Sequence, residues 1–254
     1  MSIPDFSLAG KVALITGASR GIGEAMATTF AQHGAHCILA SRKGEGLAEA
    51  AARIVAAGGK AEAIACHVGQ MEQIDVLARQ VGERFGRLDI LVNNAATNPH
   101  AGAMLTATEA QWDKTFDVNV KGAFFLIQRM VPLMIRSGGG AIINTASIEG
   151  IRPGTDRGIY SMTKSAMISM TRSFARELAE YNIRVNAILP GLVDTHMSRV
   201  LMEDEATYAQ VMRGIPMRRH ARPDELSGAA LYLASAASSY TTGAILAIDG
   251  GALA

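Results

Sequence analysis

Three side chains in the second half of the chain have the types and spacing that proton transfer requires. Tyr160 and Lys164 lie four residues apart in the stretch YSMTK, so on a helix they would share one face. A tyrosine normally titrates near pH 10, and a neighbouring ammonium would favour the phenolate and lower its pKa. The hydroxyl could then exchange a proton with a carbonyl or an alcohol near neutral pH, while Ser147 polarises the same oxygen. Because such pairs are routine on exposed helices, the elements around them decide the interpretation.

The stretch TGASRGIG at residues 16–23 predicts a site for a dinucleotide. It follows the apolar run VALIT and opens what the spacing of apolar residues predicts to be the first helix. Gly17 permits a tight turn, Gly21 lets a pyrophosphate approach the backbone, and Gly23 lets the helix pack closely on the strand. The helix N-terminus adds unpaired N–H groups and the positive end of its dipole. A plain strand-to-helix turn is the alternative.

The end of the second predicted strand indicates which dinucleotide is bound. Chains that bind NAD usually carry an acid there for the ribose 2′-hydroxyl, but residues 36–44 contain none, and Ser41 and Arg42 occupy that position. A guanidinium can hold a 2′-phosphate with two charge-assisted hydrogen bonds, and Arg20 could close on it from the glycine turn. We therefore expect NADP(H), whose oxidised nicotinamide would further favour the Tyr160 phenolate. The alternative is that both arginines are solvated surface residues.

Short apolar runs alternate with longer amphipathic stretches along the chain, which predicts strands joined by helices. Strands this apolar are buried on both faces, as in a parallel sheet covered by helices on each side. The predicted fold class is therefore α/β, a doubly wound parallel seven-stranded sheet of the Rossmann type. No linker or internal repeat divides the chain, so we expect one dinucleotide-binding domain over residues 1–254. The predicted strands are residues 12–17, 36–41, 61–68, 88–95, 140–147, 183–191 and 243–251.

The composition of the 254 residues excludes several classes of protein. Hydrophobic residues make up 49% and charged residues 19%, as in a globular protein, and the net charge is +1. Without a concentrated basic excess we expect no nucleic-acid and no membrane partner, since the one basic cluster, residues 217–222, is short. We also expect no leader and no membrane span, which needs about 20 apolar residues. Cys37 and Cys66 lie in apolar runs and are expected to be reduced, which favours a cytoplasmic protein.

One stretch, residues 116–135, is apolar nearly all round, which on a helix predicts burial on every side. In a single domain of this size, that indicates a face packed against another subunit. A central helix covered by its own chain is the alternative. Because symmetric homo-oligomers are common, we expect a homo-oligomer, with a tetramer favoured over a dimer.

Together these motifs resemble those of the short-chain dehydrogenase/reductase family, over essentially the whole chain. The resemblance is carried by TGASRGIG, NNAA at residues 93–96, Asn119 in DVNVKG, Ser147, YSMTK, PGLVDT at 190–195 and IDGG at 248–251. It implies that Tyr160 is the general acid/base, that Lys164 holds the nicotinamide ribose, that Ser147 orients the substrate and that Asn119 supports a water-mediated proton relay. With the glycine turn and the basic pair, the expected cofactor-binding set is Gly17, Ser19, Arg20, Gly21, Ile22, Gly23, Ser41, Arg42, His67, Val68, Asn94, Ala95, Tyr160, Lys164, Pro190, Gly191, Val193 and Thr195.

Within that set the resemblance assigns different parts of the dinucleotide. Asn94 and Ala95 would line the adenosine half, and the stretch 190–195 would hold the nicotinamide end. His67 is a departure, because family members often place an aspartate there for the adenine amino group; a histidine can stack or hydrogen-bond instead. The stretches SRK, CHVG, NNAATNP and WDKTFDVNV together look like the NADPH-dependent carbonyl and retinol reductase branch.

The segment 192–220, between the sixth and seventh strands, is expected to cover the substrate, as it does in the family, and its methionines could form an adaptable apolar lid. His100 and His196 could line the substrate mouth, with a surface or core position as the alternative for both. No histidine has metal-ligand spacing, so no metal is expected. Trp112 fits a lid, core or interface position equally well.

The predicted function is hydride transfer between the nicotinamide of NADP(H) and a ketone or secondary-alcohol carbon of a small molecule, with reduction as the expected direction. One alternative is a 3-oxoacyl-carrier-protein reductase, which a basic docking patch would favour. A second alternative is a dinucleotide-binding sensor without turnover, against which the intact Ser147, Tyr160 and Lys164 speak.

Overall fold

Seven parallel strands form one sheet in the order β3-β2-β1-β4-β5-β6-β7. The computed structural model describes residues 3–254, apart from the side chains of residues 200, 201 and 207. The strand order reverses between β1 and β4, and open α/β sheets bind their ligands at such a switch point. This confirms the predicted doubly wound fold. The strands are β1 Val12–Thr16, β2 His36–Ser41, β3 Lys60–Ala65, β4 Ile90–Asn93, β5 Gly140–Thr145, β6 Ile183–Pro190 and β7 Ile245–Ile248.

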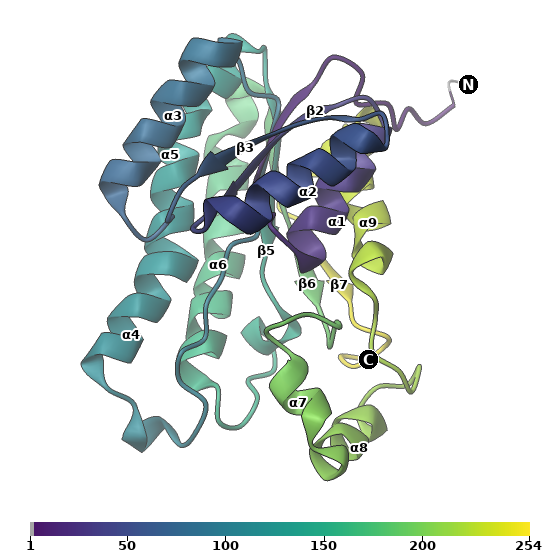
Figure 1. The fold of residues 1–254 in the computed structure, drawn as a ribbon. Helices are drawn as coiled ribbons and strands as arrows, with labels where there is room; N and C mark the ends of the chain where they lie inside the picture. The colour runs from purple at the N-terminus through teal and green to yellow at the C-terminus, as the bar shows by residue number, and fades with distance from the viewer. Residues whose placement is uncertain (1–2) are drawn as a thin grey trace.

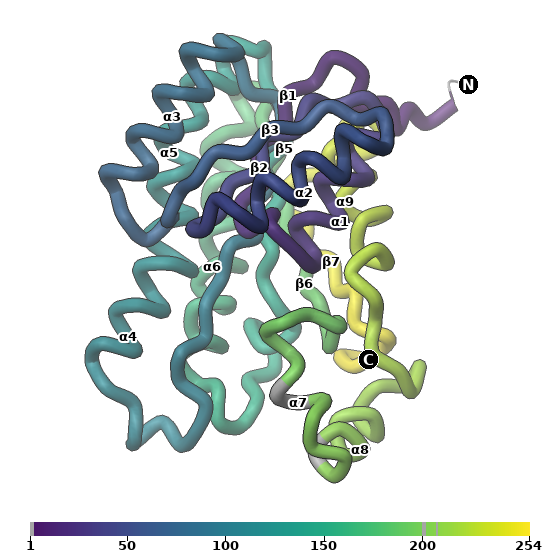
Figure 2. Tube along the Cα trace, viewed as in Figure 1, coloured from purple at the N-terminus to yellow at the C-terminus, as the bar shows by residue number. Residues whose placement is uncertain are grey.

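Helices cover both faces of this sheet (Figure 1). Helices α1, α2 and α9 share one hydrophobic core with the sheet, and α3, α5 and the end of α6 share the other. The remaining helices, α4, α7 and α8, lie at the lower end of the view, beyond the carboxyl ends of the strands (Figures 1 and 2). The α-helices are α1 Gly21–Gln32, α2 Gly44–Ala56, α3 Met71–Phe85, α4 Glu109–Phe116, α5 Gly122–Arg136, α6 Gly158–Glu177, α7 Arg199–Glu203, α8 Glu205–Arg213 and α9 Ser227–Ala234.

The central and edge strands differ in burial. All residues of β1 and β4 are buried, because apolar side chains on both faces of these strands meet covering helices. The edge strands β3 and β7 are only partly buried, and Leu246 of β7 is 38% exposed. The expectation that every strand is buried on both faces is therefore wrong for the two edges, where a strand has a neighbour on one side only.

Residues 109–136 form one nearly continuous helical stretch, in which a π-helix, Asp117–Lys121, joins α4 to α5. In the single chain Phe124 and Ile135 are exposed while Leu126 lies in the core, so the alternative of a central helix covered by its own chain is wrong, and the expected contact with another subunit stays a prediction. By length and composition this stretch could cross a membrane, contrary to the expectation of no such run. Half of its most apolar window is nevertheless buried inside the protein, as in a helix that packs on α3 and the sheet.

Both cysteines are free and buried, as expected. Burial raises the pKa of the Cys37 thiol to about 12 and that of the Cys66 thiol to about 11. Since the thiolate is the reactive form, neither side chain is a nucleophile near neutral pH.

Candidate active site

The turn between β1 and α1 is built so that the backbone itself faces the carboxyl edge of the sheet. Gly17 and Gly21 have φ angles of 66° and 65°, a left-handed conformation that favours glycine. A Cβ atom on Gly23 would lie 2.6 Å from the Gly17 carbonyl oxygen, so only glycine allows this packing of helix on turn. No side-chain hydrogen bond caps α1 at Arg20 among the described residues. The first N–H groups of the helix therefore remain available for an anion, as the glycine spacing predicts.

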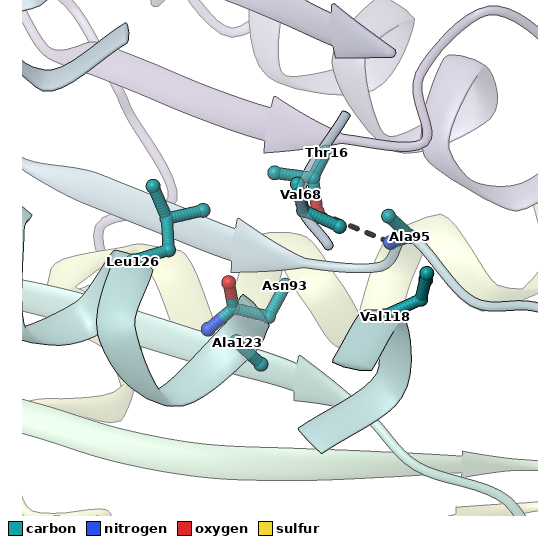
Figure 3. Close-up of a pocket in the computed structure, with 7 residues that line it drawn as sticks. All are labelled: Thr16, Val68, Asn93, Ala95, Val118, Ala123 and Leu126. Carbon is teal, nitrogen blue, oxygen red and sulfur yellow. Dashed lines mark hydrogen bonds between the residues drawn. The ribbon is translucent and has the colours of Figure 1, made fainter. Parts of the chain in front are cut away.

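Asn94 and Thr16 hold this turn against the end of β4. The Asn94 Nδ2 atom donates to the carbonyl oxygens of Thr16 at 3.0 Å and Gly17 at 3.3 Å. The backbone N–H groups of Asn94 and Ala95 both donate to the Thr16 hydroxyl. Figure 3 shows the Thr16–Ala95 bond at a small pocket that also includes Val68. Asn94 thus acts as a clamp on the glycine turn, which the sequence alone did not indicate; its expected contact with adenosine stays a prediction.

The basic pair expected to hold a 2′-phosphate lies where the sequence analysis placed it. Ser41 is the last residue of β2, and Arg42 follows it with an exposed side chain. Arg20 is also exposed, at the N-cap of α1. Among the described residues neither guanidinium forms an ion pair, although the chain has many exposed carboxylates. The two cations are therefore free to bind a phosphate of a ligand.

His67 follows β3 and has its ring held by the next turn. The ring Nδ1 atom of His67 accepts a hydrogen bond from the Gly69 N–H at 3.1 Å, while the backbone N–H of His67 donates to the Gln73 side-chain oxygen at 2.7 Å. A ring nitrogen that accepts carries no proton, so in the neutral ring the hydrogen is on Nε2. His67 can therefore present a donor, whereas the aspartate usual in the family presents an acceptor.

The loop after β6 comes back to the glycine turn. A Cβ atom on Gly191 would lie 2.8 Å from the Asp249 Cα, and Val193 pairs as an isolated bridge with Ala221. Beyond them, the Thr195 methyl group lies 3.4 Å from the position of a Cβ on Gly21. The stretch 190–195, expected at the nicotinamide end, is thus brought next to the predicted pyrophosphate site by the fold.

The proton-transfer side chains gather on α6 and at the end of β5. The Lys164 Nζ atom lies 5.4 Å from the centroid of the Tyr160 ring and donates to the Thr145 carbonyl oxygen at 2.8 Å. Lys164 is only 1% exposed, and burial lowers its pKa to about 7. Ser147, 8% exposed, accepts a hydrogen bond from the Glu149 N–H at 3.2 Å. The spacing in YSMTK therefore places the phenol and the amine together, as predicted.

The pKa of Tyr160 differs from the expectation. Burial among protein atoms is the largest cause and raises the pKa of the phenol above its usual value, although the residue as a whole is only partly buried. The negative charge of Glu149 raises it further, while a hydrogen bond with Ser147 and the positive charge of Arg157 lower it. Lys164 gives little compensating charge in the free protein, because burial lowers the pKa of its ammonium to about 7. The expectation of a lowered Tyr160 pKa also counted on the positive charge of an oxidised nicotinamide, which acts only when the dinucleotide is bound.

Asn119 lies in the π-helix and connects two walls of the site. Its Oδ1 atom accepts from the Thr97 N–H at 2.8 Å, and its Nδ2 atom donates to the Thr97 carbonyl oxygen and the Thr163 hydroxyl, both at 3.0 Å. Thr163 in turn donates to the Tyr160 carbonyl oxygen at 2.7 Å. Both amide hydrogens are taken, which leaves one lone pair of Oδ1 for a water. Asn119 therefore positions the helix that carries Tyr160, and its relay role stays a prediction.

The other singled-out residues have varied surroundings. His100 is 5% exposed, with Nε2 3.2 Å from the Thr106 hydroxyl. His196 is exposed after β6, and Trp112 stacks on Phe116 at a centroid distance of 4.4 Å. Among the described residues, no cluster of His, Cys, Asp and Glu could hold a metal ion.

Comparisons with known proteins agree with this geometry. A family model described as Enoyl-(Acyl carrier protein) reductase matches residues 17–252. Dehydrogenase/reductase SDR family member 4 of Oryctolagus cuniculus is 39% identical over 245 residues, covering 96% of this chain and 94% of that protein. The 3-oxoacyl-[acyl-carrier-protein] reductase of Thermotoga maritima is 39% identical over 244 residues, covering 96% and 98%. The crystal structure of a gluconate 5-dehydrogenase from Burkholderia cenocepacia in complex with NADP and tartrate is 33% identical with a TM-score of 0.94, covering 98% of each chain.

The glycine turn at a switch point and the serine, tyrosine and lysine beside it define an oxidoreductase of the Rossmann class. With full-length matches of this identity, the chain belongs to the short-chain dehydrogenase/reductase family of NAD(P)-dependent oxidoreductases. The resemblance that the motifs indicated is thereby confirmed.

Proposed function

We propose that this chain is an NADP(H)-dependent carbonyl reductase that transfers a hydride between the nicotinamide and a ketone or secondary-alcohol carbon, with Tyr160 as general acid/base. The observation that carries the proposal is the convergence of Tyr160, Lys164 and Ser147 at the carboxyl edge of the sheet. When bound, the dinucleotide supplies the hydride.

The residues of the chain supply the proton and the orientation. The Ser147 oxygen accepts from the Glu149 N–H, and its hydroxyl is hydrogen-bonded to the Tyr160 phenol. A substrate oxygen that enters between these two groups would take the Ser147 hydrogen bond, which polarises the carbonyl. In reduction Tyr160 then donates its proton to that oxygen, and the raised pKa of the phenol keeps it in the acid form near neutral pH. The Thr145 carbonyl oxygen holds the Lys164 amine near the Tyr160 ring, from where the amine would hold the ribose hydroxyls.

The preference for NADP(H) over NAD(H) rests on Arg20 and Arg42. Both are exposed and free of ion pairs among the described residues, and β2 ends without an acid. Two guanidinium groups can neutralise most of the charge of a 2′-phosphate at pH 7. The proposed location is the cytoplasm, where NADP is usually kept reduced, and this favours carbonyl reduction.

A 3-oxoacyl-carrier-protein reductase is the second candidate, favoured by the Thermotoga maritima relative. Such an enzyme needs a basic surface for an acidic carrier protein. In the only basic cluster that the sequence suggested, residues 217–222, Arg219 pairs with Glu225 at 2.7 Å and Arg222 with Asp224 at 3.0 Å. These pairs neutralise most of the cluster, so a free small molecule is the better-supported substrate.

We further propose that the chain forms a homo-oligomer, with a tetramer favoured over a dimer. A groove of about 300 Å³ between α5 and α6 is lined by Val120, Phe124, Ser169, Met170, Ser173, Phe174 and Glu177. Phe124 in this groove is 41% exposed, and a second copy of the chain would cover it. Size-exclusion chromatography with light scattering tests this: Phe124→Glu is expected to lower the mass of the assembly, and a monomeric wild type contradicts the proposal.

The function is tested by a panel of ketones and secondary alcohols with NADPH and NADH, followed by cofactor absorbance, with the chirality of each product determined. We expect turnover of several ketones with NADPH and much less with NADH. Turnover of acyl-carrier-protein thioesters alone would favour the second candidate. Cofactor binding without turnover of any substrate would favour the sensor.

A further inference from the structure

The loop between β5 and α6 carries a partly buried ion pair that the proposed chemistry does not use. Arg157 Nη1 donates to Glu149 Oε1 at 2.8 Å, and the Ser161 hydroxyl donates to the other carboxylate oxygen at 3.2 Å. The side chains of Glu149 and Arg157 are 15% and 28% exposed, which is low for charged residues. Two charges are seldom withdrawn from water to this extent unless their position matters for packing or function.

Each member of the pair also forms a backbone hydrogen bond at or next to a catalytic side chain. Glu149 lies in the 3₁₀ turn Ile148–Gly150, and its backbone N–H donates to the Ser147 hydroxyl oxygen at 3.2 Å. Arg157 is the N-cap of α6, and its carbonyl oxygen accepts from the Ser161 N–H at 2.9 Å, one residue beyond Tyr160. The ion pair thus closes the loop whose two ends carry Ser147 and Tyr160.

The backbone of this loop is held in an unfavourable conformation next to the pair. Asp156 has a φ angle of 63°, which is uncommon for a residue with a side chain. Its carbonyl oxygen accepts a hydrogen bond from the Gly102 N–H at 2.9 Å, which ties the loop to the segment after β4. Such conformations persist only where the surrounding structure holds them, and they gather at functional sites.

We propose that Glu149 and Arg157 form a positioning pair that holds the Ser147 hydroxyl opposite the Tyr160 phenol and sets the charge felt by that phenol. This inference rests on the proposed function, because it concerns how Tyr160 acts as acid or base. Glu149 and Arg157 are not catalytic residues, since they act through Ser147 and Tyr160.

The charges of the pair have opposite effects on the phenol. The Glu149 carboxylate disfavours the phenolate, and the Arg157 guanidinium favours it. The other ionisable group beside the phenol is Lys164 on α6, whose charge is weakened by burial. Among the described residues, Glu149 and Arg157 are the charged groups that shift the pKa of Tyr160. With Glu149 intact, Tyr160 therefore stays protonated to higher pH, which serves carbonyl reduction better than alcohol oxidation.

The experiment measures the pH dependence of kcat in both directions for Glu149→Gln, Arg157→Gln and the double variant. Glutamine keeps a hydrogen-bonding group of similar size and removes the charge. With Glu149→Gln, we expect the rise of the oxidation rate with pH to move about one unit lower, and with Arg157→Gln about one unit higher. The double variant is expected to return close to the wild-type midpoint, because both charges are gone.

The control is Glu62→Gln, which removes a carboxylate that pairs with Arg84 and His36 at the β3 edge of the sheet. It is expected to leave the pH midpoints unchanged. If the pair served only to stabilise the fold, the variants would lose thermal stability, and kcat would fall at every pH without a shift in the midpoint of its pH dependence. If the wild-type enzyme turns over ketones but neither Glu149→Gln nor Arg157→Gln moves the pH midpoint, the proposal is overturned and the proposed function stays intact.

A second readout does not depend on turnover. In protein labelled with ¹³Cζ-tyrosine and saturated with NADP⁺, the Tyr160 resonance, assigned by Tyr160→Phe, reports ionisation of the phenol directly. We expect Glu149→Gln to increase the phenolate fraction at a fixed pH and Arg157→Gln to decrease it. If wild-type protein binds the dinucleotide but turns over no substrate, the proposed function fails, and this resonance still decides the effect of the pair.

Discussion

The cofactor half and the catalytic half of the site depend on different groups, the first mainly on backbone and the second mainly on ionisable side chains. The cofactor half, at the β1–α1 turn, is made of backbone: left-handed glycines, uncapped N–H groups and the Asn94 clamp. The catalytic half, around the β5–α6 loop, is made of ionisable side chains withdrawn from water, the buried Lys164 and the partly buried pair of Glu149 and Arg157. A rigid backbone site suits a ligand that always has the same shape. A site of tuned side chains suits proton transfer, where the protonation state of one oxygen decides the rate.

The variant Tyr160→Phe is expected to separate the two halves most clearly, because it should affect catalysis and leave cofactor binding largely unchanged. Removing the phenol oxygen eliminates the proton donor, so we expect kcat to fall by about 10²-fold to 10⁴-fold. The dissociation constant for NADPH, from fluorescence titration, is expected to change little, because the backbone half is untouched. Tyr181→Phe, at an exposed position after α6, is the control. Retained turnover in Tyr160→Phe would remove this residue from the mechanism.

The opposite test is Arg42→Glu, which alters the cofactor half alone. Losing charge-assisted hydrogen bonds worth about 1.5–3 kcal/mol should weaken NADPH binding by roughly tenfold to a hundredfold, with a smaller effect on NADH. Arg79→Glu, an exposed charge reversal on α3, should affect neither cofactor. Equal losses for NADPH and NADH would contradict a 2′-phosphate site at Arg42.

Gly23→Ala tests whether the cofactor half depends on close backbone packing. The new methyl group would meet the Gly17 carbonyl oxygen at 2.6 Å, so we expect a loss of about 1–3 kcal/mol in the free energy of unfolding, measured with urea. Weaker NADPH binding should accompany it. Gly46→Ala in α2 meets no atom within 4 Å and should instead stabilise slightly, by about 0.5–1 kcal/mol. Equal stability of the two variants would exclude the packing role of Gly23.

The pH dependence of stability tests the buried charge of the catalytic half. Burial lowers the pKa of Lys164 to about 7 from its usual value near 10.5, so between these limits the unfolded chain binds more protons than the folded one. Stability should therefore rise with pH across this window, by up to about 1.4 kcal/mol per unit from this residue, and the contribution should be lost as pH falls toward 7. Lys164→Met should flatten the curve of unfolding free energy against pH; an unchanged slope would contradict the lowered pKa.

The difference between the halves also decides how much of the site the sequence could predict. The glycine turn, with Arg20 in it, and Arg42 after β2 lie where the sequence placed them, because these features depend on residues that are close in sequence. Ser147, Tyr160 and Lys164 were recognised by type and spacing, and the fold brings them together. The clamp by Asn94 and the contacts of Asn119 were not predicted, because their partners lie 22 to 78 residues away.

The fold shows the same limit. The strands and their order along the chain follow from apolar runs, but the exposure of β7 does not, because burial at an edge depends on which strands lie beside it. A buried chain of hydrogen bonds from Asn93 to Asn144 and on to Thr171 joins β4 and β5 to α6. No local pattern marks these three residues as partners.

The sequence by itself determined the fold class, the family and the residue types that meet a dinucleotide, since periodicity, glycine placement and short-range spacing are properties of neighbouring residues. The tertiary structure alone decided the electrostatics of the catalytic half: that Lys164 is buried enough to titrate near pH 7, and that Glu149 opposes ionisation of Tyr160. The physical reason is that a pKa depends on desolvation and on charges across a few ångströms of space, and folding creates both.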